Sequence, residues 1–217
     1  GIGMRDYERR AMWSGLLAVA ALACIGLAVH ASLQPGPPGP MQALFLPGLL
    51  VLPFAAVKCV IDAGVLVDAR GMRNGKGVIA HWVVPAAELA GHRGIQQRLV
   101  VREGPDLHAL PGRVPAEGLE VIFSDAAVLI GGFHFSLRAP GGSRVRSARY
   151  IASVPPLVEF ELELRPSRKV YGAQTHSHIR IGTLRGILRV PVASQAATLA
   201  EKVAVHYQST RNPRVSS

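Results

Sequence analysis

The stretch MWSGLLAVAALACIGLAVHAS, residues 12–32, contains no Asp, Glu, Lys or Arg. A second apolar stretch, MQALFLPGLLVLPFAAV, covers residues 41–57 and continues past Lys58 to Val67. A helix needs about 20 apolar residues to cross the hydrocarbon core of a bilayer, which is about 30 Å thick. Both stretches reach that length, so the sequence predicts a transmembrane hairpin with helices over about 12–32 and 41–67.

A cleaved signal peptide is the alternative interpretation of the first stretch. Arg9 and Arg10 resemble the charged start of such a peptide, and Val29–Ala31 loosely resembles a cleavage site. However, the apolar segment of a signal peptide is about 7–15 residues long, shorter than this one. A second apolar stretch also follows at once, which favours the hairpin.

The basic residues around the hairpin predict its orientation. The loop Gln34–Pro40 has no Lys or Arg, whereas the opposite flanks are basic: Arg5, Arg9, Arg10, Arg70, Arg73 and Lys76. Basic flanks stay on the cytoplasmic side of a membrane. We therefore expect a multi-pass protein of the bacterial inner membrane, with the N- and C-termini in the cytoplasm.

Two charges interrupt the second apolar stretch. Lys58 and Asp62 are four residues apart and lie on one face of a helix, so they can form an intramembrane ion pair. One interpretation is a charge in a transport path. The favoured one is an ion pair at the cytoplasmic end, with the Lys58 stem extended toward the membrane surface.

The first apolar stretch is rich in small residues, which allow membrane helices to approach closely. Packing against the second helix explains them, and self-association is the alternative. The small residues are Ser14, Gly15, Ala18, Ala21, Cys24, Gly26 and Ala28.

Composition divides the 217 residues into an apolar front and a basic remainder. The net charge is +10, and the charge excess lies beyond residue 69. Both cysteines, Cys24 and Cys59, lie in the apolar stretches, so no disulfide framework or cysteine zinc site is expected. We interpret residues 1–3 as a cloning scar before Met4, 4–69 as the hairpin unit, 70–208 as a soluble β domain, and 209–217 as a flexible tail. Abundant Arg, Ala, Gly and Val indicate a GC-rich bacterial genome.

The clearest strand is VEFELEL, residues 158–164. Val158, Phe160, Leu162 and Leu164 alternate with three glutamates, as in a sheet with one face buried and one face in water. Glu159, Glu161 and Glu163 are expected to lie opposite arginines of later strands, which are Arg180, Arg185 and Arg189.

Further elements follow from turn signals and apolar runs. We expect a short helix over 85–90 and a terminal helix over 194–207 with Ser194 as its N-cap. A hairpin is expected around Gly131–Gly132. The expected strands are 78–84, 98–102, 119–123, 128–130, 133–137, 149–154, 179–181 and 184–190.

This order of about seven strands and a terminal helix resembles pleckstrin-homology-like domains, over residues 77–207. The hairpin before it resembles a class of bacterial membrane proteins built from these two parts. The resemblance implies a mainly antiparallel β domain, a barrel or sandwich, with the C-terminal helix plugging one end. The short helix after the first strand departs from the family pattern.

Candidate chemical sites are few. His176 and His178 are the one close histidine pair, but no Cys, Asp or Glu completes a zinc site beside them. The Gly-Gly pairs fit hairpin turns and match no nucleotide fingerprint. The cluster Arg144, Arg146 and Arg149 is the candidate anion-binding site, because guanidinium groups hold phosphates well. A solvated basic loop is the alternative.

The sequence therefore predicts a non-enzymatic membrane-anchored module whose basic domain binds a protein or an anionic surface. The alternative is an accessory subunit of a larger membrane complex, and an enzyme with an unrecognised site is less favoured. Expected partners are membrane lipid and a protein partner or a second copy of the chain. No cofactor or metal is expected. Nucleic acid is not favoured, because the domain has few aromatic residues among its basic ones.

Overall fold

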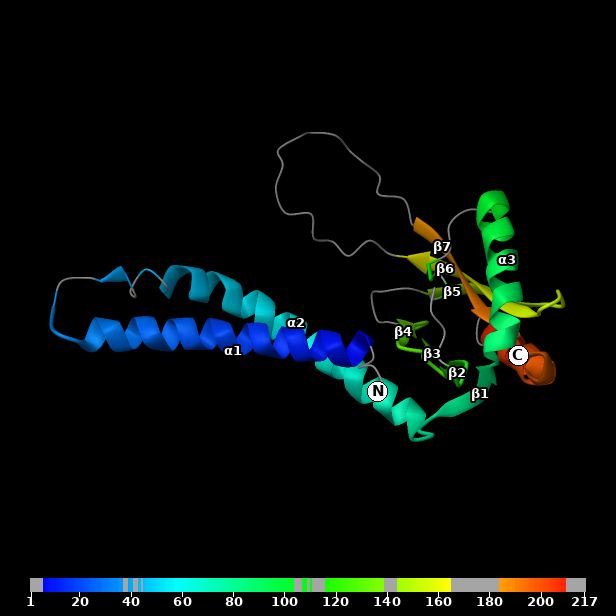
Figure 1. Ribbon diagram of the computed structural model, residues 1–217, viewed down its shortest axis with the longest axis horizontal. Coiled ribbons are helices and arrows are strands. Elements are labelled where there is room, and N and C mark those ends of the chain that lie inside the picture. Colours follow the sequence, from blue (N-terminus) through cyan, green and yellow to red (C-terminus); the bar gives the residue numbers. More distant parts are fainter. Residues whose placement is uncertain are drawn as a thin grey trace, which may run out of the picture. The chain divides into compact units, whose positions relative to one another are not determined.

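The computed structural model (Figure 1) describes residues 6–36, 39–40, 43, 45–103, 107–108, 110, 116–138, 144–164 and 184–209. The chain divides into two compact units, one up to Asn74 and one from Gly75 onward. In chain order the elements are α1 (Asp6–Leu33), α2 (Phe45–Arg73), β1 (Val78–Val84), α3 (Ala86–Glu103), β2 (Leu119–Ser124), β3 (Ala127–Ile130), β4 (Phe133–Ser136), β5 (Arg144–Ile151), β6 (Leu157–Leu164), β7 (Leu184–Pro191), a 3-10 turn η2 (Ser194–Ala196) and α4 (Ala197–Ser209).

The first unit is an apolar hairpin of α1 and α2, which run antiparallel side by side (Figure 1). Both helices are long and apolar enough to cross a membrane, as predicted. α1 has 28 residues and α2 has 29, so each is about 42 Å long at 1.5 Å per residue. Large apolar side chains such as Trp13, Phe54 and Val60 point outward and are exposed. This is the pattern of a hairpin whose outer surface faces lipid or another protein.

The two helices meet along a seam of mostly small residues spaced seven apart. The buried seam positions are Tyr7, Ser14, Ala21 and Ala28 on α1, and Gly48, Ala55 and Ala69 on α2. A strict seven-residue repeat keeps one side of each helix against its neighbour when the pair winds with a left-handed twist. The seam confirms that packing against α2 accounts for small residues of α1, although it uses only some of them.

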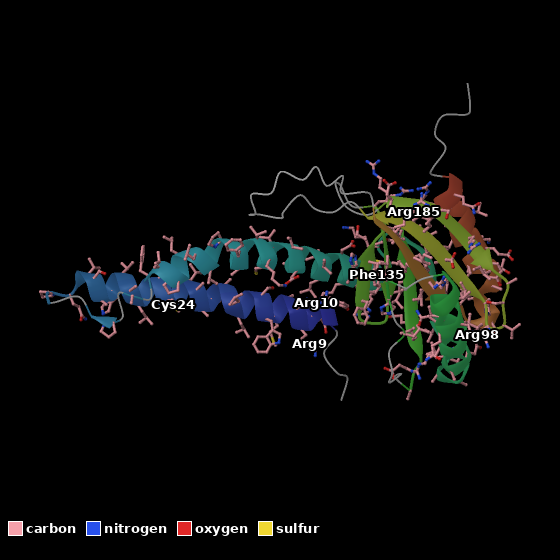
Figure 2. The ribbon with its side chains drawn as sticks, turned by 90° about the horizontal axis from the view of Figure 1, so that it is seen from above. Arg9, Arg10, Cys24, Arg98, Phe135 and Arg185 are labelled. Carbon is pink, nitrogen blue, oxygen red and sulfur yellow. The ribbon has the colours of Figure 1, made fainter. Side chains whose placement is uncertain are left out.

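Polar contacts join the two helices at the end that holds the chain's N-terminal residues and Arg73. The Arg73 guanidinium donates a hydrogen bond to the Tyr7 hydroxyl and lies 5.3 Å from the Tyr7 ring centre. Beside it, Arg70 lies 3.9 Å from Glu8. Arg9 and Arg10 lie at this same end of α1 (Figure 2). Arg70 and Arg73 also occupy the last turn of α2, where cations interact favourably with the helix dipole.

The second unit contains two antiparallel sheets in its described part, ordered β1-β2-β3-β4 and β5-β6-β7. The predicted strand 78–84 and the predicted hairpin around Gly131–Gly132 are both confirmed. Gly131 has a φ of +58°, which suits glycine in this tight turn. The sheets are open in the described residues, with one isolated bridge between Arg138 and Arg144.

The hydrophobic core of this unit is made entirely by residues between Ala80 and Tyr207. Phe160 on β6 lies at its centre, 5.8 Å from the ring of Phe123 and 5.4 Å from the ring of Tyr207. The Tyr207 hydroxyl donates a hydrogen bond to the Ser124 carbonyl, and burial raises the pKa of the phenol above its usual value. The predicted terminal helix is confirmed as α4, and its buried side packs in this core.

The predicted strand over 98–102 is wrong, because α3 continues from Ala86 to Glu103. The buried side of α3 consists of Leu89, His92 and Ile95, which are spaced as in a helix. His92 is the polar residue among them. The residues of 98–102 extend that helix and do not pair with any strand in the described sheets.

Two boundaries also differ from the prediction. β5 begins at Arg144, not Arg149, so the arginine cluster lies on a strand and not in a loop. Ser194 is not a helix N-cap: Ala193 occupies that position, and the Ser194 hydroxyl donates to Glu88 Oε2 at 3.1 Å.

A short segment runs along the outer edge of β7. The Leu107 amide donates to the Ile187 carbonyl at 2.8 Å. The Gln96 side chain of α3 holds the same segment at two points, donating to the His108 carbonyl at 2.7 Å and accepting from the Leu110 amide at 3.1 Å. The edge strand β7 is therefore partly covered by its own chain.

Candidate functional site

Charged side chains line the face of the β5-β6-β7 sheet opposite the core. We call this set the arginine–glutamate ladder. It consists of Arg144, Arg146 and Arg149 on β5, Glu159, Glu161 and Glu163 on β6, and Arg185 and Arg189 on β7. The strand register places Glu159 between Arg149 and Arg189, and Glu163 between Arg144 and Arg185. Glu161 lies opposite Ser147 and Ile187. The three arginines of the predicted cluster thus lie on a strand whose neighbour supplies carboxylates to the same surface.

A bulge in β5 brings the arginines onto this face. Arg144 and Arg149 are five residues apart, so in a regular strand they would point to opposite faces. The pairing with β6 shifts between Val145 and Ser147, which inserts Arg146 as an extra residue. One extra residue reverses the alternation, so Arg144 lies opposite Glu163 and Arg149 lies opposite Glu159.

One end of the ladder is buried. Glu159 Oε1 lies 2.6 Å from Arg149 Nη2, and Glu159 Oε2 accepts from Arg189 Nε at 2.9 Å. The side chains of Glu159 and Arg189 are only 8% and 3% exposed. The prediction that all three glutamates face water is therefore wrong at Glu159. Such a pair holds the sheet in register, and loss of either partner leaves a buried charge uncompensated.

The other end of the ladder is exposed to solvent. Glu161 lies 3.9 Å from Arg146 and 3.7 Å from Arg185, and the Ser147 hydroxyl donates to it at 3.3 Å. The Arg185 side chain is 61% exposed, and Arg144 is exposed as well. Figure 2 shows Arg185 at the surface of the β domain. Exposed pairs of this kind contribute at most about 1 kcal/mol each to stability. An anionic partner could therefore bind the exposed arginines with only a small loss of free energy from their existing ion pairs.

The charge balance of the ladder favours anions. It carries five arginines and three glutamates, an excess of two positive charges. The expected pairing of Arg185 and Arg189 with the β6 glutamates is confirmed, whereas Arg180 lies outside the described residues. The β7 arginines were expected only as partners of the glutamates. Their place on the same face as the β5 arginines depends on the strand register, which the sequence does not show.

A small cavity lies beside the buried end of the ladder. His92, Gln96, Leu157 and Arg189 are among its lining residues. Its volume of about 10 Å³ is room for about one water molecule. Small-molecule sites are usually about 300–1,000 Å³, so this cavity is not a substrate pocket.

Two histidines near this cavity are buried. The His92 ring nitrogen Nε2 lies 3.1 Å from the Val192 carbonyl oxygen. The His108 ring packs against Phe133 and Phe135, with ring centres 4.6 and 5.4 Å away, and its Nε2 has no hydrogen-bond partner among the described residues. Burial lowers the pKa of both histidines below the usual value.

These two histidines predict acid sensitivity. Below about pH 6.5 the unfolded chain protonates them, whereas the folded protein keeps them neutral until the lower folded-state pKa is reached. The free energy of unfolding should therefore fall as the pH drops from about 7 toward 5, by up to about 1.4 kcal/mol per pH unit for each histidine. Urea unfolding at a series of pH values measures this slope.

The His108→Leu variant should show a shallower slope than the parent. His81→Gln is the control, because His81 is half exposed and lies 3.4 Å from Glu120. An unchanged slope in His108→Leu would contradict a neutral buried His108.

No group of three metal-binding side chains occurs among the described residues, and the pair His176 and His178 lies outside them. Lys58 and Asp62 form an ion pair on α2, as their spacing predicts. Comparison of the chain with protein-family models, with curated proteins and with solved structures found no match.

Proposed function

We propose that this chain is a non-enzymatic membrane-anchored module of the bacterial inner membrane. The hairpin of α1 and α2 spans the bilayer, and the β domain binds an anionic lipid surface through the exposed arginines of the ladder. The single observation that carries this proposal is the outward exposure of large apolar side chains on both long helices. A surface of that kind is stable in hydrocarbon and unstable in water.

The ladder supports the second half of the proposal. Arg144 and Arg185 flank Glu163 in the register and are both exposed. Guanidinium groups form paired hydrogen bonds with phosphate oxygens. The order of four strands, three strands and a terminal helix also supports a likeness to pleckstrin-homology-like domains.

The first test concerns the anchor and its orientation. The full chain expressed in bacteria should stay in the membrane pellet after alkaline carbonate extraction. A reporter enzyme that is active only in the periplasm, fused after Ser217, should be silent because the basic flanks keep both ends in the cytoplasm. Release of the chain into the carbonate supernatant would contradict the proposed membrane anchor. Strong reporter activity would reverse the orientation.

The second test concerns the ladder. Residues 75–217 contain their own core and should bind vesicles with anionic lipid while ignoring neutral ones. Each basic residue near such a surface contributes about 1 kcal/mol, so Arg144→Ser with Arg185→Ser should weaken binding about tenfold or more. Salt should weaken the parent as well, since screening acts over about 10 Å at 0.1 M.

A variant with the same loss of charge serves as control. Arg98→Ser with Lys202→Ser changes two exposed cations on α3 and α4 that are not part of the ladder. Figure 2 shows Arg98 apart from Arg185. This variant should lose less binding than the ladder variant. Equal losses of vesicle binding in the two variants would show that only the net charge of the domain matters. If the parent does not bind anionic vesicles even at low salt, the ladder would be assigned to a protein partner.

A further inference from the structure

Lys58 lies near the middle of the proposed membrane span. At 1.5 Å per residue it is about 20 Å along α2 from Phe45 and about 18 Å from Arg70. Its Nζ is bonded to Asp62, one helical turn toward Arg70. If α2 spans the membrane, the Lys58 charge is therefore held well inside a hydrocarbon core that is about 30 Å thick, and not at the cytoplasmic end that the favoured interpretation of the sequence gives it.

The exposure of this ion pair is asymmetric. The Asp62 side chain is 14% exposed, whereas the Lys58 side chain is 56% exposed. Asp62 continues the seven-residue seam, midway between Ala55 and Ala69, and interacts with the buried Ser14 across the hairpin. Asp62 is thus held by the packing of the two helices, and it fixes Lys58 beside it on the outer surface.

A half-exposed ammonium group at this depth needs a covering partner. Ionised side chains inside membranes almost always face other protein or a water-filled cavity. Within the described hairpin, neither protein nor a cavity covers Lys58, because more than half of its side chain is exposed. The rest of its flank is largely apolar. We call this side of the hairpin the Lys58 flank. It consists of the residues that lie three positions after a seam residue, as Lys58 does after Ala55. Its other members are Leu17 and Cys24 on α1, and Val51 and Val65 on α2.

We propose that a second copy of this hairpin packs on the Lys58 flank. In a symmetric pair of identical chains, each surface meets its own copy, so Lys58 of one chain approaches Asp62 of the other and the reverse. The four charges sum to zero, which means that the pair needs no foreign counter-charge. The interface combines reciprocal ion pairs with apolar side chains and covers both lysines.

The proposal rests on the membrane anchor of the proposed function. The test uses the full chain with Cys59→Ser, reconstituted in neutral phospholipid vesicles at low protein-to-lipid ratio. Cys24 is then its one cysteine, and its spacing of three residues from Ala21 places it on the Lys58 flank. Oxidation should yield a disulfide-linked dimer through Cys24. A matched control carries Cys24→Ser, Cys59→Ser and Leu22→Cys, which moves the thiol to the other flank, and should yield little dimer.

Lys58→Met should reduce the Cys24-linked dimer about three- to twentyfold, the effect of interhelical polar contacts in membranes. Swapping the charges, with Lys58→Asp and Asp62→Lys together, should restore it. Crosslinking that is absent, or that is equal in Lys58→Met and the parent, would overturn the proposal. Carbonate extraction of the same samples distinguishes failure of the pairing from failure of the membrane anchor. If the chain stays in the membrane but does not crosslink, only the pairing is refuted.

Discussion

Replacing Phe160 with Asp should unfold the β domain. Phe160 is fully buried and contacts Phe123 of the other sheet and Tyr207 of α4, so it joins three parts of the core. The change removes a large aromatic contact and places a carboxylate among the apolar side chains of the core. Losses of this type exceed about 4 kcal/mol, a large share of the 5–15 kcal/mol that is typical of a whole domain.

Urea unfolding of residues 75–217, followed by tyrosine and tryptophan fluorescence, measures this effect. Phe160→Leu is the matched control, since it keeps an apolar side chain and should cost only a part of that amount. A folded Phe160→Asp protein with stability close to the parent would show that β6 does not direct this side chain into the core.

The second large effect is expected at Glu159. Glu159→Gln keeps the size of the side chain but removes the negative charge between Arg149 and Arg189. Arg189 is then left charged and almost fully buried. Breaking a buried ion pair in this way costs about 3–5 kcal/mol, so the variant should be much less stable than the parent.

Glu161→Gln is the control for this experiment, because Glu161 lies on the same strand and face but is 33% exposed. It should cost at most about 1 kcal/mol. Replacing both Glu159 and Arg189 with Met should recover much of the stability lost in Glu159→Gln, since no buried charge then remains. Equal effects of Glu159→Gln and Glu161→Gln would show that the inner pair is as solvated as the outer one.

The sequence predicts best those elements that are determined by their own residues. Residues 158–164 alternate strictly, and β6 forms with its apolar side in the core. The two long apolar stretches form α1 and α2 for the same reason. In contrast, α3 places His92 and Gln96 among its inward positions, so its apolar pattern is interrupted and the sequence predicts a strand over 98–102.

The candidate site depends on neighbours that are distant in sequence. The ladder needs the bulge at Arg146 to bring Arg144 and Arg149 to one face, and a bulge leaves no mark in the residue pattern. The burial of Glu159 is equally invisible, because the alternation of β6 treats its three glutamates alike. The seven-residue spacing from Tyr7 to Ala28 is readable from the sequence and is the signal that would have located the helix seam.

The segment that runs along β7 bears on how the protein behaves when it is crowded. An uncovered edge strand is a template on which strands of other chains add, and this is a common route to aggregation and domain swapping. At Ile187 the edge carbonyl already accepts the Leu107 amide, and Gln96 holds the neighbouring residues in place. A strand of another chain must displace the Leu107 amide before it can pair with β7 at Ile187. The proposed membrane anchor would concentrate copies of the β domain in a thin layer, where protection of this edge matters most.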